Sequence, residues 1–327
     1  MRAPSFLALG LTGFIVLGVA ASATVIATSQ PDTCESSDTV TTAASLVNVG
    51  QVAETPVPEV FFPTPLKTTG TERLTIADGD GQQAANGSAV DFQVSVFFGV
   101  TNEFLTSSSY DSAQPVRRVV DSDSEDFFSR ELHCATSGEQ IVFTSTVADV
   151  FGPIPEDDII QNTSTVVVVV DVQQAYMPRP TGRASLPERG LPQVVDHPEG
   201  FHGISFPMAP PPSDLAIQTI IQGDGPVASD GDQVVVHFTG VVWETQSVFS
   251  SSFDQLTPIT LSLVDGSLEG ATTGVIGGVY QAILDARVGS RVLAVIPPEF
   301  GYPAGSTPPG VPPGATLVYV FDVLGIE

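Results

Sequence analysis

Two stretches of this 327-residue chain repeat the same series of features, and this repeat limits the possible folds more than any other property of the sequence. Each copy begins with a Gly-Asp-Gly triplet and a turn signal, passes through alternating strand patterns, and ends on a long valine-rich strand. The matched segments, in chain order, are 79–81 and 223–225, 90–97 and 234–238, 107–111 and 250–254, 137–140 and 288–291, and 164–172 and 315–323. The order and spacing predict two related domains of about a hundred residues each.

The repeat divides the chain into five predicted segments. They are a signal peptide or N-terminal anchor (1–23), a lead-in segment (24–70), a first domain (71–176), a proline-rich linker (177–213) and a second domain (214–327). Proline at the density of the linker is expected to prevent sheet pairing and to stiffen the chain. Its apolar stretch 201–206 could instead pack on one of the domains.

The first residues have the composition of an export signal. Arg2 is followed by an apolar run from Phe6 to Ala23, and Ala21-Ser22-Ala23 gives the small-x-small pattern of a cleavage site. The alternative is an uncleaved anchor, because the run is about as long as a membrane-spanning helix. Both alternatives predict that the rest of the chain is exported and lies outside the cytoplasmic membrane.

The charge of the chain excludes one class of partner. The formal net charge is −26, from 11 Lys and Arg against 37 Asp and Glu. Nucleic-acid phosphates would be repelled by most of such a surface, so no nucleic-acid partner is expected. An anionic membrane surface is disfavoured for the same reason, and the membrane is expected to be reached only through an uncleaved N-terminus.

The chain has two cysteines, Cys34 and Cys134. In an oxidising compartment an even pair is typical of a disulfide, which makes this pair a disulfide candidate, with two free thiols as the alternative. A metal site would need ligands at regular spacing, and the four histidines show none: His133, His197, His202 and His237. No metal is expected.

An acidic run occupies residues 121–126, Asp-Ser-Asp-Ser-Glu-Asp. Carboxylates at such spacing suit a hard cation such as Ca²⁺. A run of this kind is more often a solvated loop, and we favour that interpretation.

The second domain carries a series of motifs that identify a family. In chain order they are Val-Val-His-Phe-Thr-Gly (235–240), Phe-Ser-Ser (249–251), Val-Ile-Gly-Gly (275–278), Val-Gly-Ser-Arg (288–291), Ile-Pro-Pro-Glu-Phe-Gly-Tyr (296–302) and Val-Pro-Pro-Gly-Ala-Thr-Leu-Val-Tyr (311–319). Together they resemble the FKBP-type peptidyl-prolyl cis-trans isomerases. The resemblance is strong over residues 215–326, whereas the first domain, 71–176, resembles the family only through the repeat, as a degenerate second copy.

The resemblance implies an α+β fold of tandem FKBP-like domains, each a curved antiparallel β-sheet wrapped around one short helix. In the second domain, the apolar spacing from Val279 to Ala286 is typical of that helix. The pocket of the family lies between the sheet and the helix.

The resemblance also implies a function and a set of residues. Isomerases of this family rotate X–Pro peptide bonds of polypeptide clients, without a cofactor and without covalent chemistry. The implied catalytic residues are Tyr302, Phe249 and Ile276, which contributes its backbone N–H. The implied substrate-binding residues are Phe238, Val275, Val279, Val311 and Tyr319. The partners expected are proline-containing polypeptides, and the chain is expected to be a monomer.

Several positions depart from the family pattern. Ser250 stands where the family has an aspartate, Val279 where it has a tryptophan, and Phe238 where it has a tyrosine. In the first domain Thr106 and Ser107 stand where the family has Phe-Asp. The departures predict reduced isomerase activity and weak binding of macrolide inhibitors. The alternative is a catalytically weak or inactive binding module, a chaperone for unfolded clients.

Overall fold

The computed structural model describes residues 34, 43–50, 57–155, 160–197, 201–268, 273–303 and 305–327. The predicted signal peptide or anchor, residues 1–23, lies outside the described residues. No helix in the described part of the chain is both long enough and apolar enough to span a membrane.

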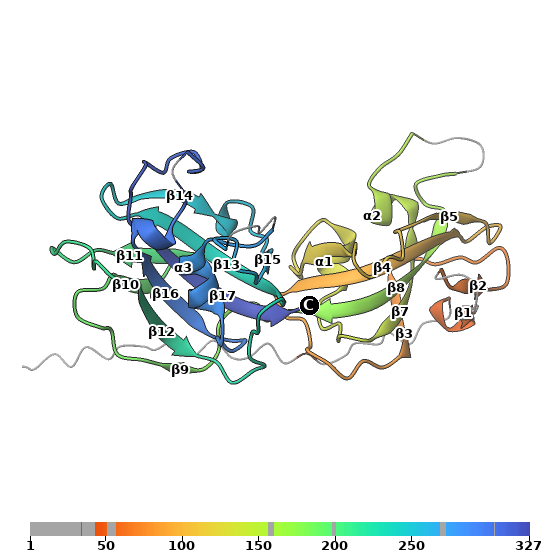
Figure 1. Cartoon of the computed structure of the whole chain (residues 1–327). Coiled ribbons are helices and arrows are strands. Elements are labelled where there is room, and N and C mark those ends of the chain that lie inside the picture. Colours follow the sequence, from red (N-terminus) through yellow and green to blue (C-terminus); the bar gives the residue numbers. More distant parts are fainter. Residues whose placement is uncertain are drawn as a thin grey trace, which may run out of the picture. The chain divides into compact units, whose positions relative to one another are not determined.

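The first half of the chain folds into an antiparallel sheet (Figure 1). Its strands run in the order β3-β7-β8-β4-β5, and β6 pairs with the first residues of β4. The strands are β3 (Glu72–Ala77), β4 (Ala89–Phe98), β5 (Phe104–Ser107), β6 (Val116–Val119), β7 (Gln140–Thr146) and β8 (Thr165–Ala175). Two short helices, α1 (Phe127–Glu131) and α2 (Val147–Phe151), lie in its connections.

The second half forms an antiparallel sheet with the order β14-β13-β17-β16-β12-β9, and β15 pairs with β13. The strands are β9 (Arg183–Ala184), β12 (Ala216–Gln222), β13 (Gln233–Val242), β14 (Ser247–Ser251), β15 (Ile259–Ser262), β16 (Arg291–Ile296) and β17 (Leu317–Ile326). The helical elements are α3 (Gly277–Ile283) and the 3-10 turns η2 (Ser252–Asp254) and η3 (Pro298–Phe300).

The two sheets have the same topology. Strands β3 to β8 take the places of β12 to β17 in sheet order and in pairing, and β9 is an addition to the second sheet. The pairing of each central strand shifts register at the same point, between Asp91 and Phe92 in β4 and between Val235 and Val236 in β13. The shared topology confirms the predicted α+β class and the tandem repeat.

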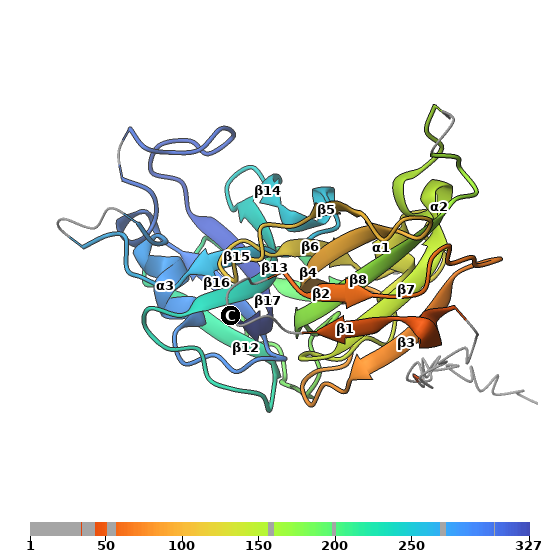
Figure 2. The ribbon, with the colours of Figure 1, turned by 90° about the vertical axis from the view of Figure 1, so that its right-hand side faces the viewer.

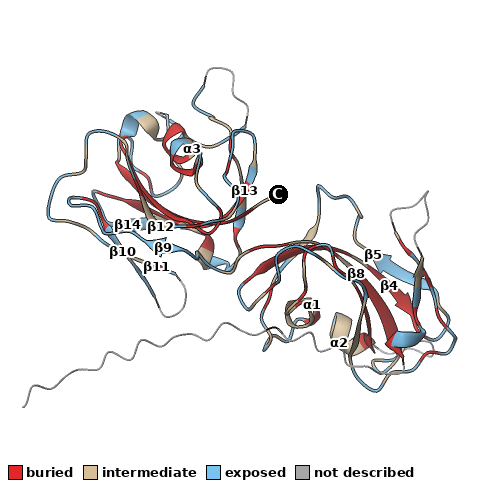
Figure 3. Ribbon diagram, turned by 90° about the horizontal axis from the view of Figure 1, so that it is seen from below, coloured by how far each residue is buried: buried red, intermediate tan, exposed pale blue. Residues whose placement is uncertain are grey.

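The last strand of each half along the chain, β8 or β17, lies inside its sheet and is buried on both faces. This burial explains its unbroken apolar sequence. On one face of β8, Val166, Val168 and Val170 pack in the core with Phe127 of α1. On its other face, Val167 and Val169 pack under residues of the lead-in segment. Strand β17 is arranged in the same way, with Tyr319, Phe321 and Val323 toward α3 and Val318 and Val320 away from it. Figure 3 shows the resulting burial along β4, β8 and β13.

The outer face of each sheet is covered by a hairpin that precedes it in sequence. In the first half, η1 (Ala44–Leu46), β1 (Asn48–Gly50) and β2 (Glu59–Phe61) belong to this cover, and Figure 2 shows β1 and β2 beside the sheet. In the second half, β10 (Gln193–Asp196) pairs with β11 (His202–Ser205), and Val194, Ile204 and Phe206 pack against the outer face.

The hairpin and β9 correct one prediction. Residues 177–213 were expected to be a stiff linker without sheet pairing, yet β9 pairs with β12 and β10 pairs with β11. The reason is that the prolines lie outside the paired residues, so the strands between them keep their N–H donors. The expectation that part of 201–206 packs on a domain agrees with the burial of Phe206 against Trp243, with ring centroids 5.3 Å apart.

Helix α3 spans Gly277–Ile283. It begins two residues before the predicted start at 279 and ends three residues before the predicted end at 286. It ends early because the backbone N–H of Asp285 donates to the carbonyl of Ala228, and that of Ala228 donates to Ala286. Gly278 allows the helix to approach the sheet, because a Cβ atom there would lie 2.4 Å from Ile296. In the first half, α1 lies between β6 and β7 as α3 lies between β15 and β16, and α2 is an additional short helix at the position of η3.

A disulfide joins Cys34 to Cys134, whose Cα atoms are 5.4 Å apart. It links the lead-in segment to the turn between α1 and β7. Of the two alternatives that the sequence leaves open, the structure has the disulfide, so these sulfurs are not available as free thiols.

Candidate functional site

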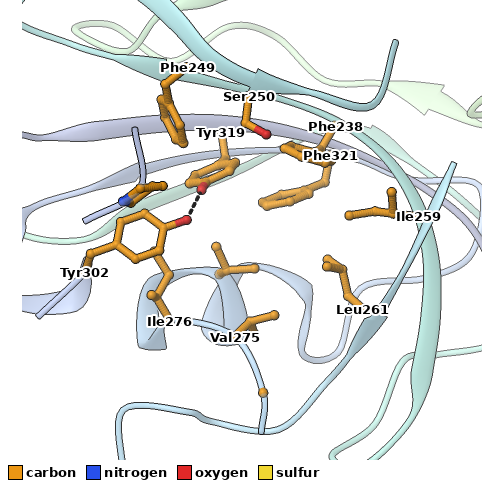
Figure 4. Close-up of a pocket in the computed structure, with 13 residues that line it drawn as sticks. Phe238, Phe249, Ser250, Ile259, Leu261, Val275, Ile276, Tyr302, Tyr319 and Phe321 are labelled. Carbon is orange, nitrogen blue, oxygen red and sulfur yellow. Dashed lines mark hydrogen bonds between the residues drawn. The ribbon is translucent and has the colours of Figure 1, made fainter. Parts of the chain in front are cut away.

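A pocket of about 290 Å³ opens in the second half, between the start of α3 and the strands of the sheet (Figure 4). Its volume is at the lower end of the range of roughly 300–1,000 Å³ that is usual for ligand pockets. The lining residues are mostly aliphatic and aromatic: Phe238, Phe249, Ser250, Ile259, Leu261, Gly274, Val275, Ile276, Val279, Tyr302, Pro308, Tyr319 and Phe321. The pocket therefore suits an apolar group and has room for a proline ring.

Seven of the eight predicted site residues line this pocket. They are Phe238, Phe249, Val275, Ile276, Val279, Tyr302 and Tyr319. The exception is Val311, which is 7% exposed and belongs to the core of the second half. Pro308 lines the pocket in its place, since the N–H of Val311 donates to the carbonyl of Pro308 in a turn that directs Val311 inward.

Sequence reasoning missed several residues of the wall. Ile259 and Leu261 come from β15, and Phe321 lies two residues after Tyr319 on β17. The signal for them was the period of two along a strand, which places residues i and i+2 on one face. Gly274, Pro308 and the hydroxyl-bearing Ser250 complete the lining.

The aromatic rings form a continuous wall. The ring of Tyr319 stacks on that of Phe321, with centroids 5.2 Å apart, and meets the edge of Phe249 at 5.6 Å. Gly240 makes this contact possible, because a Cβ atom there would lie 2.8 Å from the ring of Phe249 and 3.0 Å from that of Tyr319. Edge-to-face and offset contacts of this kind hold aromatic rings in fixed orientations.

Two tyrosine hydroxyls meet at one side of the pocket. The hydroxyl oxygens of Tyr302 and Tyr319 are 2.9 Å apart, as the dashed line in Figure 4 marks. Tyr319 is 5% exposed, whereas Tyr302 is half-buried in the loop after the η3 turn. Burial, followed by the neighbouring Tyr302, raises the pKa of Tyr319 above its ordinary value, so the hydroxyl of Tyr319 stays protonated at neutral pH.

The start of α3 forms the base of the pocket. Val275, Ile276 and Val279 present aliphatic side chains to it. Ile276 is the residue before the helix, and its N–H donates to no group among the described residues. This N–H and the hydroxyls of Tyr302 and Ser250 are therefore the polar groups available to a ligand.

The chemistry of the lining limits what the pocket can do. Its thirteen residues include no carboxylate, imidazole, thiol or amine. Nucleophilic and general acid–base mechanisms need such groups within hydrogen-bond reach of one another. What the lining offers is an apolar cavity with a few hydrogen-bond donors.

The first half does not reproduce this lining. By the register of β4 and β8, Val94, Val96 and Val168 take the positions of Phe238, Gly240 and Tyr319. Val96 thus places a side chain where, at Gly240, the second half has the rings of Phe249 and Tyr319. The core of this half is filled from α1 instead, by Phe127 against Phe143 and Phe128 against Phe92.

The hydrogen bonds shift the alignment of the two halves by one residue in this segment, relative to the alignment made from the sequence. The N–H of Val94 donates to Ser108, and the N–H of Phe238, at the equivalent position, donates to Ser252. Ser108 therefore corresponds to Ser252, where the sequence comparison paired Ser108 with Ser251. It follows that Leu105 and Thr106, rather than Thr106 and Ser107, occupy the positions of Phe249 and Ser250.

One cluster of cysteine and histidine side chains in the described part of the chain has the spacing of a metal site but is not one. Possible ligand atoms of Cys34, His133 and Cys134 lie within 4.8 Å of one another. The two sulfurs are joined in the disulfide, so neither offers a thiolate. In the acidic run 121–126, Asp126 caps α1 by accepting from the N–H of Ser129, which is a structural role.

A second polar cluster lies on the opposite face of the sheet from the pocket. His202 of β11 and Arg291 of β16 both hydrogen-bond the carboxylate of Asp322, at 3.0 and 2.6 Å. Burial alone would raise the pKa of Asp322, but the hydrogen bonds from Arg291 and His202 lower it below its ordinary value. Since His202 belongs to the β10–β11 hairpin, the cluster fastens that hairpin to the sheet.

Comparisons with known proteins identify the family of the second half. The model of the FKBP-type peptidyl-prolyl cis-trans isomerase family matches residues 225–324. An FK506-binding protein of Streptomyces anulatus is 36% identical over 124 residues, which are 38% of this chain and 94% of that protein. A protein named as a probable FK506-binding protein, from Corynebacterium glutamicum, is 38% identical over 122 residues, or 37% of this chain and 94% of that protein.

Among solved structures, the three FKBP domains of a wheat protein align with 79% of this chain and 95% of that chain, at 17% identity and a TM-score of 0.33. The family match and the relatives together place the chain in a class of enzymes. The chain belongs to the FKBP-type peptidyl-prolyl cis-trans isomerases, which confirms the family and the enzyme class predicted from the sequence.

Proposed function

We propose that the pocket of the second half catalyses rotation about X–Pro peptide bonds of polypeptide clients. The observation that carries this proposal is the lining itself, an aromatic and aliphatic cavity with the Tyr302 hydroxyl at one side. The proline ring would enter the cavity between Phe238, Phe249 and Tyr319, over the aliphatic base at Ile276.

The barrier to this rotation comes from amide resonance and is about 18–20 kcal/mol. A twisted amide is less dipolar than a planar one, so a dry, apolar cavity favours the twisted state. The hydroxyl of Tyr302 and the N–H of Ile276 would donate to carbonyl groups of the bent substrate chain. No bond is made or broken in this mechanism, which agrees with a lining that offers no base to activate the hydroxyl of Ser250 as a nucleophile.

The departures at two positions set the expected level of activity. Val279 gives the base of the pocket a smaller and less flat surface than an indole ring would give, so the proline ring is held less firmly. Ser250 supplies a hydroxyl in place of a carboxylate. We therefore expect weak to moderate isomerase activity and low affinity for macrolide inhibitors.

The sequence supports a proposal for the clients and the location. The apolar run Phe6–Ala23 supports export, and the clients would then be proline-containing polypeptides that fold outside the cytoplasmic membrane. The first half, with its core filled by Phe127 and Phe128, would have a structural or client-binding role. We expect the protein to act as a monomer.

The test is the cis–trans exchange rate of a short X–Pro peptide, measured by NMR exchange spectroscopy with the full chain. The proposal expects exchange faster than the spontaneous rate, and a loss of that acceleration in Phe249→Ala and in Tyr302→Phe. Tyr280→Phe is the matched control, because the Tyr280 hydroxyl bonds Asp230 and lies outside the pocket.

Two outcomes would contradict the proposal. Acceleration that survives Phe249→Ala and Tyr302→Phe would place catalysis elsewhere in the chain. The absence of any acceleration would leave the alternative, a non-catalytic binding module for unfolded clients. That alternative would be measured as suppression of client aggregation by the full chain.

A further inference from the structure

The hydroxyl of Tyr319 has one hydrogen-bond partner among the described residues, the hydroxyl of Tyr302 at 2.9 Å. Its ring stacks on Phe321 and makes an edge-to-face contact with Phe249. These two contacts fix the orientation of the ring and therefore the position of the hydroxyl. Because Tyr319 is 5% exposed, water reaches its hydroxyl far less readily than it reaches a surface group. The hydrogen of Tyr319 thus has one acceptor available, the oxygen of Tyr302.

The direction of this hydrogen bond decides what Tyr302 can do. A phenol carries one donor hydrogen and can also accept. If Tyr319 donates, the hydrogen of Tyr302 stays free and can be directed at a ligand in the pocket. If Tyr302 donates, its hydrogen is occupied and the buried hydrogen of Tyr319 has no acceptor, which costs free energy.

We propose that Tyr319 is a positioning residue that donates to Tyr302 and thereby fixes and strengthens the hydrogen bond from Tyr302 to the substrate carbonyl. This inference rests on the proposed X–Pro mechanism. A hydroxyl that accepts a hydrogen bond becomes a stronger donor, because hydrogen bonds in a chain polarise one another. The rigid β17 strand also holds Tyr302, which itself lies in the loop after η3, at one place at the rim of the pocket.

The experiment is a double-mutant cycle in the full chain with Tyr319→Phe, Tyr302→Phe and the double variant. The measured quantity is kcat/KM for an X–Pro peptide, together with the urea midpoint of each variant. Tyr319→Phe keeps the ring and its packing and removes the hydroxyl alone. Tyr176→Phe is the control for the loss of a buried tyrosine hydroxyl, because Tyr176 donates to Asp91 away from the pocket.

We expect Tyr319→Phe to lower kcat/KM about threefold, mainly through kcat, which is the effect of weakening one hydrogen bond in the transition state. We expect no further loss when Tyr319→Phe is added to Tyr302→Phe, because Tyr319 acts through Tyr302. A merely structural role would lower the activity of the single and the double variant by the same factor.

Three results would overturn the inference. They are an unchanged kcat/KM in Tyr319→Phe, an increase caused by release of the Tyr302 hydrogen, and effects of the two substitutions that multiply. These results differ from a failure of the proposed function itself. In that case Tyr302→Phe would leave the catalysed rate unchanged, whatever Tyr319→Phe does.

Discussion

His237 is a buried histidine on the outer face of the second sheet. It is 7% exposed, its Nδ1 lies 2.8 Å from the hydroxyl of Ser252, and its ring stacks on Phe253 with centroids 4.4 Å apart. Burial lowers the pKa of His237 to about 4, and nearby His202 lowers it too, while the charge of Asp322 acts in the opposite direction. His237 is therefore neutral in the folded protein at neutral pH.

This shift makes the stability of the protein depend on pH. In the unfolded chain His237 takes up a proton below pH 6.5, whereas in the folded chain it stays neutral until about pH 4. The unfolded state thus binds more protons in this window, and the free energy of unfolding falls as the pH falls from 6.5 to 4, by about 3 kcal/mol at most.

The matched variant is His237→Gln, because Gln93 holds the equivalent position in the first half and its side chain accepts from Ser108 at 2.5 Å. We expect this variant to lose that part of the pH dependence while the other titrating groups keep theirs. Urea unfolding from pH 4 to pH 8 measures the difference. Parallel curves for the two proteins would show that His237 does not titrate as described.

At the scale of an element, Gly240 on the β13 strand is one of the positions at which the sheet with a pocket differs from the sheet with a filled core. Gly240 leaves room for the rings of Phe249 and Tyr319, and Val96 fills the same position in β4. We expect Gly240→Val to displace the ring of Phe249 and to lower kcat/KM at least about tenfold, since misplaced pocket groups lose orientation.

Gly70→Val is the control for Gly240→Val, because a Cβ atom at Gly70 meets nothing within 4 Å. Its activity should equal that of the unmodified chain in the same peptide assay. If Gly240→Val kept full activity, the aromatic wall at Phe249 would not be needed for catalysis.

The β10–β11 hairpin gives a second prediction at this scale. Phe206 packs edge-on against Trp243, while Phe201 is 37% exposed and stacks on His197 at the end of the hairpin. We expect Phe206→Ala to lower the free energy of unfolding by about 2 kcal/mol and Phe201→Ala by less than about 0.5 kcal/mol. Urea denaturation of the full chain compares them. Equal losses would mean that the hairpin does not depend on its contact with the sheet.

At the scale of the whole molecule, the sequence predicted the repeat, the class and most of the pocket, because these follow from ordered motifs. It could not predict the covering hairpins, since proline density describes local backbone preference and not which apolar side chains a sheet leaves uncovered. The same limit applies to the pocket. Ile259 and Leu261 become its wall only through the pairing of β15 with β13, whereas Val311 is taken into the core by a turn.

Arg117 joins the two sheets. Its guanidinium donates to both carboxylate oxygens of Asp91 at 2.6 Å, and to Thr260 and Glu327 of the second half at 3.0 and 2.7 Å. It also lies 5.1 Å from the ring centroid of Tyr176. Asp91 is 2% exposed, and Arg117 is the cation that pairs with its buried carboxylate.

Arg117→Met should therefore lower the free energy of unfolding by about 3 kcal/mol, because it leaves the buried carboxylate of Asp91 without its cation. Adding Asp91→Val should recover much of this loss, since Val235 holds the equivalent position in the second sheet. Trp243 is the only tryptophan of the chain, so its fluorescence reports on the second half, while far-UV circular dichroism reports on both. The two signals should unfold together in the unmodified chain and separately in Arg117→Met. Coincident transitions in both proteins would show that Arg117 does not couple the two sheets.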